Sequence, residues 1–245
     1  MADDREIVLD TETTGFEPHE GDRIVEIGAV ELIGKMPTGR TYHQYINPMR
    51  SMPEGAFGIH GIGPDLLDVP RDPKPGEVIL KDKPLFADIA QDFVDFVGDS
   101  RMVIHNAAFD MKFLNAELGW LNRPRLPMDQ SLDTLAIARR KFPGSPASLD
   151  ALCRRFGIDN TNRTLHGALL DSEILAEVYL ELIGGRQPGM ELKAVRTSNS
   201  SGVDEDWRPS RRADPLPPRI SEEEAAAHAK FIDSLGDDAL WKTLN

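Results

Sequence analysis

The sequence predicts an α/β domain with a mixed β-sheet, followed by a tail. Three strand-like segments come first, and strand and helix patterns then alternate along the chain, an order typical of α/β domains. With 245 residues, the chain is long enough for one domain of about 150–200 residues and a tail. Hydrophobic residues make up 40% and charged residues 28% of the sequence, which is typical of a soluble globular protein.

Three strands are expected near the amino terminus. Residues 6–10 open as a buried strand, residues 24–33 form a longer strand rich in β-branched side chains, and residues 41–46 form the third. The pair Asn47-Pro48 ends the third strand. Glycines and a proline in residues 34–39 indicate a hairpin turn between the second and third strands.

The pattern then changes to a helical period. Residues 86–97 carry apolar side chains at helical spacing and end before Gly98, and a short buried strand follows at residues 102–104. Residues 71–84 are rich in charge and proline and are interpreted as a surface loop. Further helices are expected at residues 109–118, 132–141, 148–156 and 168–183.

The composition changes after residue 194. Residues 197–218 are rich in Ser, Asp, Arg and Pro, so they cannot bury enough apolar surface to fold alone, and a flexible linker is expected there. A short helix is expected at residues 221–235, where Ser221 and Glu224 can form a capping box.

The overall charge limits the kinds of function. The formal net charge is −13, whereas tight non-specific DNA binding by a broad basic surface depends on Lys and Arg neutralising phosphates. An acidic protein that acts on DNA needs metal ions at its site and gains from a partner that delivers the substrate. The single cysteine, Cys153, excludes an internal disulfide, and the first residues lack the apolar segment of a signal peptide. A cytoplasmic location is expected.

Two carboxylates lie near the end of the first strand. Asp10 and Glu12 are two residues apart, so the alternation of a strand puts both on one face of the sheet. Neighbouring carboxylates repel each other in a half-buried site, and a hard cation such as Mg²⁺ or Mn²⁺ would remove that repulsion. The alternative is a pair of acids that cap the turn at residues 13–15.

Three further residues can join these carboxylates. Asp171 falls on the core-facing side of its helix, where an unpaired charge is costly, so a metal ion or an arginine is expected as its partner. His166 can converge with Asp171 only if it stands before the helix, and a loop histidine suits general-base chemistry, although many are ordinary surface residues. Asp110 begins a helix, where an acid ordinarily stabilises the amino-terminal end.

Together these residues resemble the motifs of the DEDDh family of 3′→5′ exonucleases. Residues 7–15 (IVLDTETTG) match the first motif, residues 103–110 (VIHNAAFD) the second and residues 166–171 (HGALLD) the third. Three motifs in the correct order are specific, although each alone is not. Residues 56–62 and 148–153 also resemble the proofreading members of this family in bacterial replication, and the likeness covers roughly residues 5–192.

The resemblance implies an RNase H-like fold with a five-stranded mixed sheet. Two Mg²⁺ or Mn²⁺ ions would be held by the four acids, His166 would act as the general base, and nucleoside 5′-monophosphates would be released from DNA. An exonuclease that trims RNA and a non-catalytic scaffold that binds polymerase are the alternatives. The positions at which the family contacts metal or the terminal nucleotide are Asp10, Glu12, Thr13, Ile59, His60, Phe109, Asp110, His166 and Asp171.

Partners are expected for the carboxyl-terminal part of the chain. Gln187, Met190 and Leu192 resemble the sliding-clamp-binding peptides of replication proteins. In the helix at residues 221–235, an apolar stripe, together with Leu240 and Trp241, is expected to dock on a polymerase subunit. The expected divisions are therefore an exonuclease domain, a clamp-binding peptide with a linker, and a polymerase-binding segment, at residues 1–186, 187–218 and 219–245.

Overall fold

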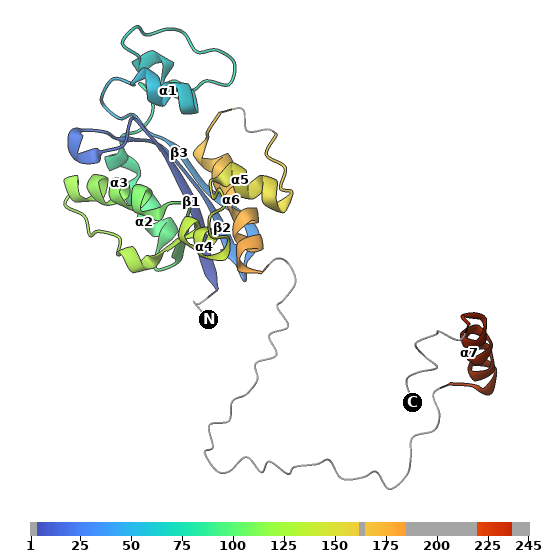
Figure 1. The fold of residues 1–245 in the computed structure, drawn as a ribbon. Helices are drawn as coiled ribbons and strands as arrows, with labels where there is room; N and C mark the ends of the chain where they lie inside the picture. Colours follow the sequence, from blue (N-terminus) through green and yellow to red (C-terminus); the bar gives the residue numbers. More distant parts are fainter. Residues whose placement is uncertain (1–3, 162–164, 185–219, 237–245) are drawn as a thin grey trace, which may run out of the picture. The chain divides into compact units, whose positions relative to one another are not determined.

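The structure is a computed structural model that describes residues 4–161, 165–184 and 220–236 (Figure 1). The chain divides into two compact units, Met1–Glu191 and Leu192–Asn245, and each is described by itself. The first unit contains the β-sheet and helices α1 to α6, and the second contains helix α7. Every helix in the described ranges is too short or too polar to cross a membrane.

A β-sheet lies at the centre of the first unit (Figure 1). It has five strands, in the order β3-β2-β1-β4-β5. Strands β1 (Arg5–Thr13), β2 (Ile24–Ile33) and β3 (Met36–Tyr45) pair in antiparallel fashion. Strand β4 (Arg101–Ile104) runs parallel to β1, and β5 (Ser131–Asp133) runs parallel to β4. The mixed five-stranded sheet confirms the predicted fold class.

Helices cover both faces of this sheet (Figure 1). Helices α2 (Phe86–Val97) and α3 (Ala107–Trp120) pack on one face, and α6 (Ala168–Ile183) packs on the other. Helices α4 (Thr134–Lys141) and α5 (Leu149–Phe156) pack against α6. The central strands are therefore buried on two sides, which explains their nearly continuous apolar sequences.

The side chains of β1 alternate between the two faces of the sheet and contribute to the hydrophobic core on each face. Ile7 and Leu9 belong to the cluster beneath α2 and α3, whereas Val8 packs with Leu175 of α6. The strand continues to Thr13, beyond the end that the sequence predicts. Both acids that the sequence places near the end of this strand therefore lie inside it.

The hairpin between β2 and β3 is tighter than the sequence predicts. Only Gly34 and Lys35 form the turn, with φ of 57° and 69°, and two left-handed residues are what a two-residue hairpin favours. Pro37 therefore lies within β3, where an edge position tolerates its missing N–H. The β2–β3 register shifts between Val30 and Leu32, a change typical of a bulge.

The predicted helix over residues 132–141 and the predicted loop over residues 71–84 need correction. Leu132 belongs to β5, and α4 begins at Thr134. In the loop, Leu80 is fully buried and its N–H donates to the Asp65 carboxylate. Leu80 belongs to a small hydrophobic cluster with Val25, Met52 and Ile62. A short helix that the sequence does not predict, α1 (Glu54–His60), packs against this cluster.

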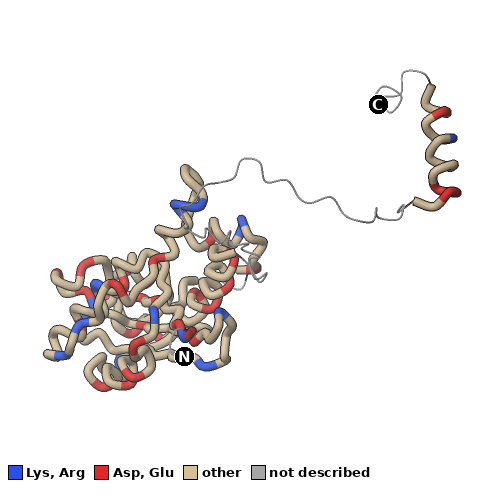
Figure 2. Tube along the Cα trace, turned by 90° about the horizontal axis from the view of Figure 1, so that it is seen from below, with Lys and Arg blue, Asp and Glu red and all other residues tan. Residues whose placement is uncertain are grey.

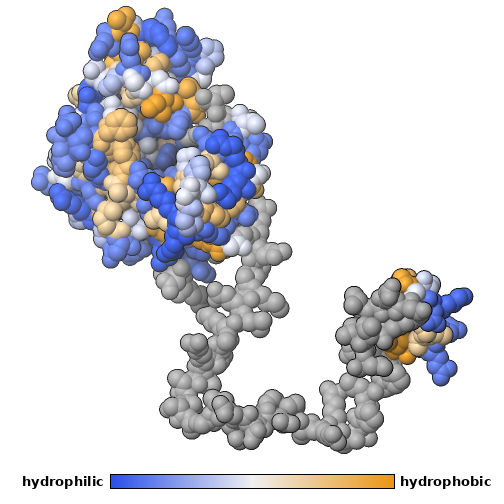
Figure 3. All heavy atoms as spheres, in the orientation of Figure 1, coloured by the Kyte–Doolittle hydropathy of each residue, from blue (hydrophilic) through white to orange (hydrophobic). Residues whose placement is uncertain are grey.

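The second unit contains α7 (Glu222–Ser234). Its predicted capping box is confirmed, because Ser221 Oγ accepts the N–H of Glu224 and the Glu224 carboxylate accepts the N–H of Ser221. Phe231 and Leu235 are 60% and 54% exposed, so this helix presents apolar side chains on its surface (Figure 3). The predicted clamp-binding residues Gln187, Met190 and Leu192, the linker, and Leu240 with Trp241 lie outside the described residues.

Candidate active site

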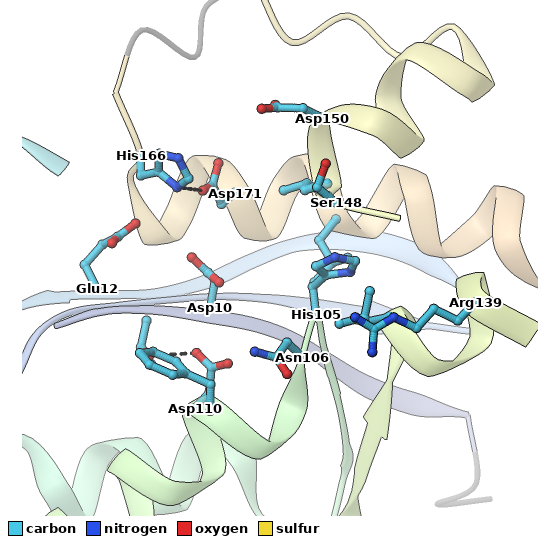
Figure 4. Close-up of a pocket in the computed structure, with 15 residues that line it drawn as sticks. Asp10, Glu12, His105, Asn106, Asp110, Arg139, Ser148, Asp150, His166 and Asp171 are labelled. Carbon is cyan, nitrogen blue, oxygen red and sulfur yellow. Dashed lines mark hydrogen bonds and ion pairs between the residues drawn. The ribbon is translucent and has the colours of Figure 1, made fainter. Parts of the chain in front are cut away.

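A cavity of about 480 Å³ lies beside the carboxyl ends of β1 and β4 (Figure 4). Side chains reach it from β1, from the segment after β4, from α3 and from the start of α6. Crevices at the carboxyl ends of strands are common ligand sites in α/β sheets. The five residues that the sequence predicts as catalytic all line it: Asp10, Glu12, Asp110, His166 and Asp171.

Asp10 and Glu12 lie on the α6 face of β1. Asp10 pairs with Gly28 and Glu12 pairs with Glu26 across the β1–β2 ladder. A side chain at Gly28 would place its Cβ 2.1 Å from the backbone nitrogen of Leu169. The missing side chain therefore lets the first turn of α6 lie directly over β2, beside the two acids.

His166 and Asp171 meet at the start of α6. Asp171 is 3% exposed and lies in the first turn of the helix. His166 stands before the helix, as its convergence with Asp171 requires, and its backbone N–H donates to the Ile59 carbonyl at 3.1 Å. Its Nδ1 is 3.5 Å from Asp171 Oδ2, and its side chain is 47% exposed. The backbone of His166 is thus fixed by a hydrogen bond, while its imidazole is accessible from the cavity.

Asp110 enters the cavity from the first turn of α3. It is 2% exposed and accepts a 2.7 Å hydrogen bond from the Thr11 hydroxyl. Burial raises the pKa of Asp110 to about 7, although the Thr11 hydrogen bond opposes the shift. Burial, followed by repulsion from Asp110 and Glu12, raises the pKa of Asp10 well above its ordinary value. Burial and mutual repulsion therefore favour the neutral form of these two acids.

The donor groups fit divalent metal ions. Glu12, His166 and Asp171 each offer a ligand atom within 4.8 Å of the others, and Asp10 and Asp110 line the same cavity. Most of these donors are carboxylate oxygens, which Mg²⁺ and Mn²⁺ prefer. A bound cation would also favour the charged form of acids whose pKa is raised by burial and mutual repulsion.

A second cavity of about 660 Å³ adjoins the first and shares Thr11, Glu12 and Phe109 with it. Burial lowers the pKa of His60 to about 4, and its Nδ1 accepts the N–H of Ile62 at 3.0 Å. The ring is therefore neutral at physiological pH. Besides Glu12, four of the positions at which the resembled family contacts metal or the terminal nucleotide line this cavity: Thr13, Ile59, His60 and Phe109.

Other lining residues of the first cavity have no role in the sequence-based prediction. His105 Nδ1 lies 2.9 Å from the Thr134 hydroxyl, and burial lowers the pKa of His105. Arg139 extends from α4 toward His105 and Asn106 (Figure 4). Among the described residues that line either cavity, Arg139 is the one arginine and none is a lysine. Acidic and basic residues are interspersed along the described chain, without a continuous basic stripe in the view shown (Figure 2).

Comparisons with known proteins found a matching family and similar sequences. The family model described as exonuclease matches residues 7–179. DNA polymerase III subunit epsilon of Rickettsia felis is 48% identical over 240 residues, which cover 96% of this chain and 98% of the relative. The protein of the same name from Escherichia coli (strain K12) is 42% identical over 252 residues, which cover 97% of each chain.

Solved structures share the fold. Exonuclease X in complex with 5′ overhanging duplex DNA is 26% identical, has a TM-score of 0.52, and covers 73% of this chain and 90% of its own. The nuclease domain of 3′hExo, described as a DEDDh family member bound to rAMP, is 18% identical with a TM-score of 0.57. That match covers 74% of this chain and 92% of the other. These similarities confirm the predicted RNase H-like exonuclease architecture.

Proposed function

The chain belongs to the exonuclease family whose model spans residues 7–179, and on this basis we propose that it is the proofreading 3′→5′ exonuclease subunit of a bacterial DNA polymerase III. It hydrolyses the 3′-terminal phosphodiester of DNA and releases nucleoside 5′-monophosphates. One observation carries this proposal: four carboxylates and a solvent-accessible histidine line a single cavity that adjoins a second, more apolar one.

Divalent metal ions are the cofactors that the family and the carboxylate cluster imply. We propose that they are two Mg²⁺ or Mn²⁺ ions and that the four acids Asp10, Glu12, Asp110 and Asp171 hold them. When bound, such ions supply an activated water and stabilise negative charge on the leaving oxygen. The carboxylates of this chain would position the scissile phosphate through the ions that they hold, because all four line the same cavity.

His166 accepts the proton of the attacking water. Its ring is accessible from the cavity, and its backbone bond to Ile59 and its approach to Asp171 orient it. As water attacks phosphorus, the bond to the 3′ oxygen of the preceding nucleotide breaks, and that oxygen takes up a proton. The shortened strand keeps a 3′-hydroxyl, so the next nucleotide can be removed in the same way.

The second cavity receives the terminal nucleoside. Ile59 and Phe109 offer apolar surface against which an unpaired base can stack, and the neutral His60 adds no charge there. Arg139 provides the positive charge in the first cavity for a backbone phosphate of the same strand. An unpaired end fits this site because its last base is free to leave the duplex.

We expect release of labelled mononucleotides from a 3′-labelled DNA primer in Mg²⁺ or Mn²⁺ and none in EDTA. Paired and mismatched primers and an RNA of the same sequence are digested in parallel. A mismatched end should be cleaved faster because fraying supplies the unpaired base. Faster cleavage of the RNA than of either primer would support RNA trimming instead, and no cleavage with either metal would support the scaffold.

Two partner contacts are proposed for the part of the chain after residue 186. Residues 187–192 would bind the sliding clamp (beta), and residues 219–245 would dock on the polymerase alpha subunit, with residues 187–218 containing the peptide and the linker. The exposed Phe231 of α7 and Leu235, which directly follows the helix, support a docking role. A tether would hold this acidic nuclease at up to about millimolar effective concentration beside the primer end, which compensates for weak DNA affinity. The protein would then act in the cytoplasm, at the replication fork.

Two variants of the full chain should separate these contacts. Changing Gln187, Met190 and Leu192 together to alanine should abolish clamp binding and leave the polymerase complex intact. Trp241→Ala should weaken the polymerase complex, since buried aromatics often dominate interfaces, and leave clamp binding intact. Calorimetry with each purified partner measures both, so each variant is the control for the other. Unchanged binding of its own partner by either variant would contradict that contact.

A further inference from the structure

A fifth carboxylate lies close to the catalytic acids without belonging to them. Glu26 of β2 is 2% exposed and is the cross-strand neighbour of Glu12. Its Oε2 accepts the backbone N–H of Ala168 at 3.0 Å, and its Oε1 is 2.7 Å from Nε2 of His43 on β3. A buried carboxylate is retained at a high desolvation cost unless such partners satisfy it.

The hydrogen bond to Ala168 is made at the first residue of α6. The first N–H groups of a helix have no partner within the helix, and no side-chain cap is provided by Gly167, the residue at the N-cap position. The Glu26 carboxylate takes this role from a different element, and its negative charge suits the amino-terminal end of a helix.

A second contact fixes the same turn. Ser172 Oγ donates to the Gly28 carbonyl at 2.9 Å, and Gly28 lacks the side chain that would collide with Leu169. The first turn of α6 is thus attached to β2 at two neighbouring points, before and after Asp171. His166 lies two residues before the Ala168 attachment.

We propose that Glu26 is a positioning residue for catalysis: by capping α6 from β2, it sets the distance of His166 and Asp171 from the acids of β1. His43 orients the carboxylate from the other side. The inference rests on the exonuclease function proposed above, but it concerns only how the site is held in place.

Glu26→Ala should lower kcat by about tenfold or more, because a misplacement of about 1 Å can cost around 100-fold in rate. KM for a single-stranded oligonucleotide should change less than twofold, since Glu26 lines neither cavity. Glu26→Gln should restore most of kcat, because its amide oxygen can accept the Ala168 N–H and its amide N–H can face His43. Glu26→Asp keeps the charge but withdraws it by one methylene, and should lose kcat as the alanine variant does.

Glu31 provides a matched control on the same strand. It is also 2% exposed, but its carboxylate is held by Arg5, Arg40 and Thr38. Glu31→Ala should destabilise the protein while keeping wild-type kcat below its melting temperature. Wild-type kcat in Glu26→Asp, or an equal loss of kcat in Glu31→Ala, would overturn the proposal.

Amide hydrogen exchange supplies a readout that does not depend on activity. The Ala168 amide should exchange faster in Glu26→Asp than in the wild type, and Glu31→Ala should leave it unchanged. Wild-type protection of that amide in Glu26→Asp would also overturn the proposal. Cleavage by the wild-type protein itself tests the exonuclease function, so failure of the two ideas can be told apart.

Discussion

Asp10→Ala is expected to abolish cleavage and to leave the fold intact. The loss should be about 10³-fold or more, since metal-ion charge stabilisation is worth several kcal/mol and about 1.4 kcal/mol corresponds to tenfold in rate. Circular dichroism and a labelled-primer assay in Mg²⁺ measure the two effects. Glu173→Ala removes an exposed carboxylate on α6 two residues from Asp171 and is the control, with wild-type cleavage expected.

The same substitution should change how the stability of the metal-free protein depends on pH. The pKa of Asp110 is raised to about 7 and that of Asp10 is raised well above its ordinary value in the folded protein. An unfolded aspartate has a pKa of about 3.9, so the folded state binds more protons between about pH 4 and pH 7. The stabilisation is present below that window and is lost as pH rises through it.

Thermal melts in EDTA at about pH 4 and pH 7.5 would measure this dependence. The melting temperature of the wild type should fall more steeply with pH than that of Asp10→Ala, because the variant lacks one of the repelling carboxylates. Adding Mg²⁺ at pH 7.5 should stabilise the wild type more than the variant, since a ligand stabilises the state that binds it. Near-normal cleavage by Asp10→Ala in Mg²⁺ would refute the proposed mechanism.

His166→Ala is expected to lower kcat by about 10²–10⁴-fold, the usual contribution of a positioned general base. Binding of a single-stranded oligonucleotide should change little, because the acids and the second cavity remain. The wild-type rate should rise with pH, since only the neutral ring can accept a proton. The variant should lose that rise.

Two other histidines lie at the cavities, but burial lowers the pKa of His60 to about 4 and also lowers that of His105. His60 therefore stays neutral while the rate rises and cannot account for that rise. His19→Ala, at an exposed position in the short helix Pro18–Glu20, is the control and should keep the wild-type rate and profile. A wild-type rate and pH profile in His166→Ala would show that another group is the base.

Elements whose apolar residues recur at regular spacing and that end at a recognisable residue could be predicted from the sequence. The bounds of β2, α2 and α6 agree with the predicted ranges, and Gly98 and Gly184 follow the two helices. Strand β5 was not predictable because its three residues are too short to show alternation, and Leu132 fits the helical spacing that follows. Helix α1 contains Gly55 and Gly58, which disfavour a helix in isolation, and its packing overrides that preference.

Residues of the candidate site were predictable where a charged side chain falls among apolar ones in the sequence pattern. Asp171 is an acid on the apolar side of a helix, and the motif order joins it to Asp10 and Glu12. Glu26 conflicts in the same way with its apolar strand, but its partner is a backbone N–H 142 residues away. Arg139 lies on an exposed part of a short helix, where an arginine is ordinary. Such partners depend on tertiary packing, which a single sequence does not display.

The two outer strands of the sheet limit how copies of this protein can associate. Unpaired strand edges are templates for aggregation and domain swapping. On β3, Pro37 removes one N–H and the nearby register shift distorts the ladder, so an added strand could pair continuously only beyond that shift, toward Tyr45. At the opposite edge, β5 offers three residues, Ser131–Asp133. Several copies held close together in a multi-subunit assembly would therefore resist joining edge to edge into extended sheets.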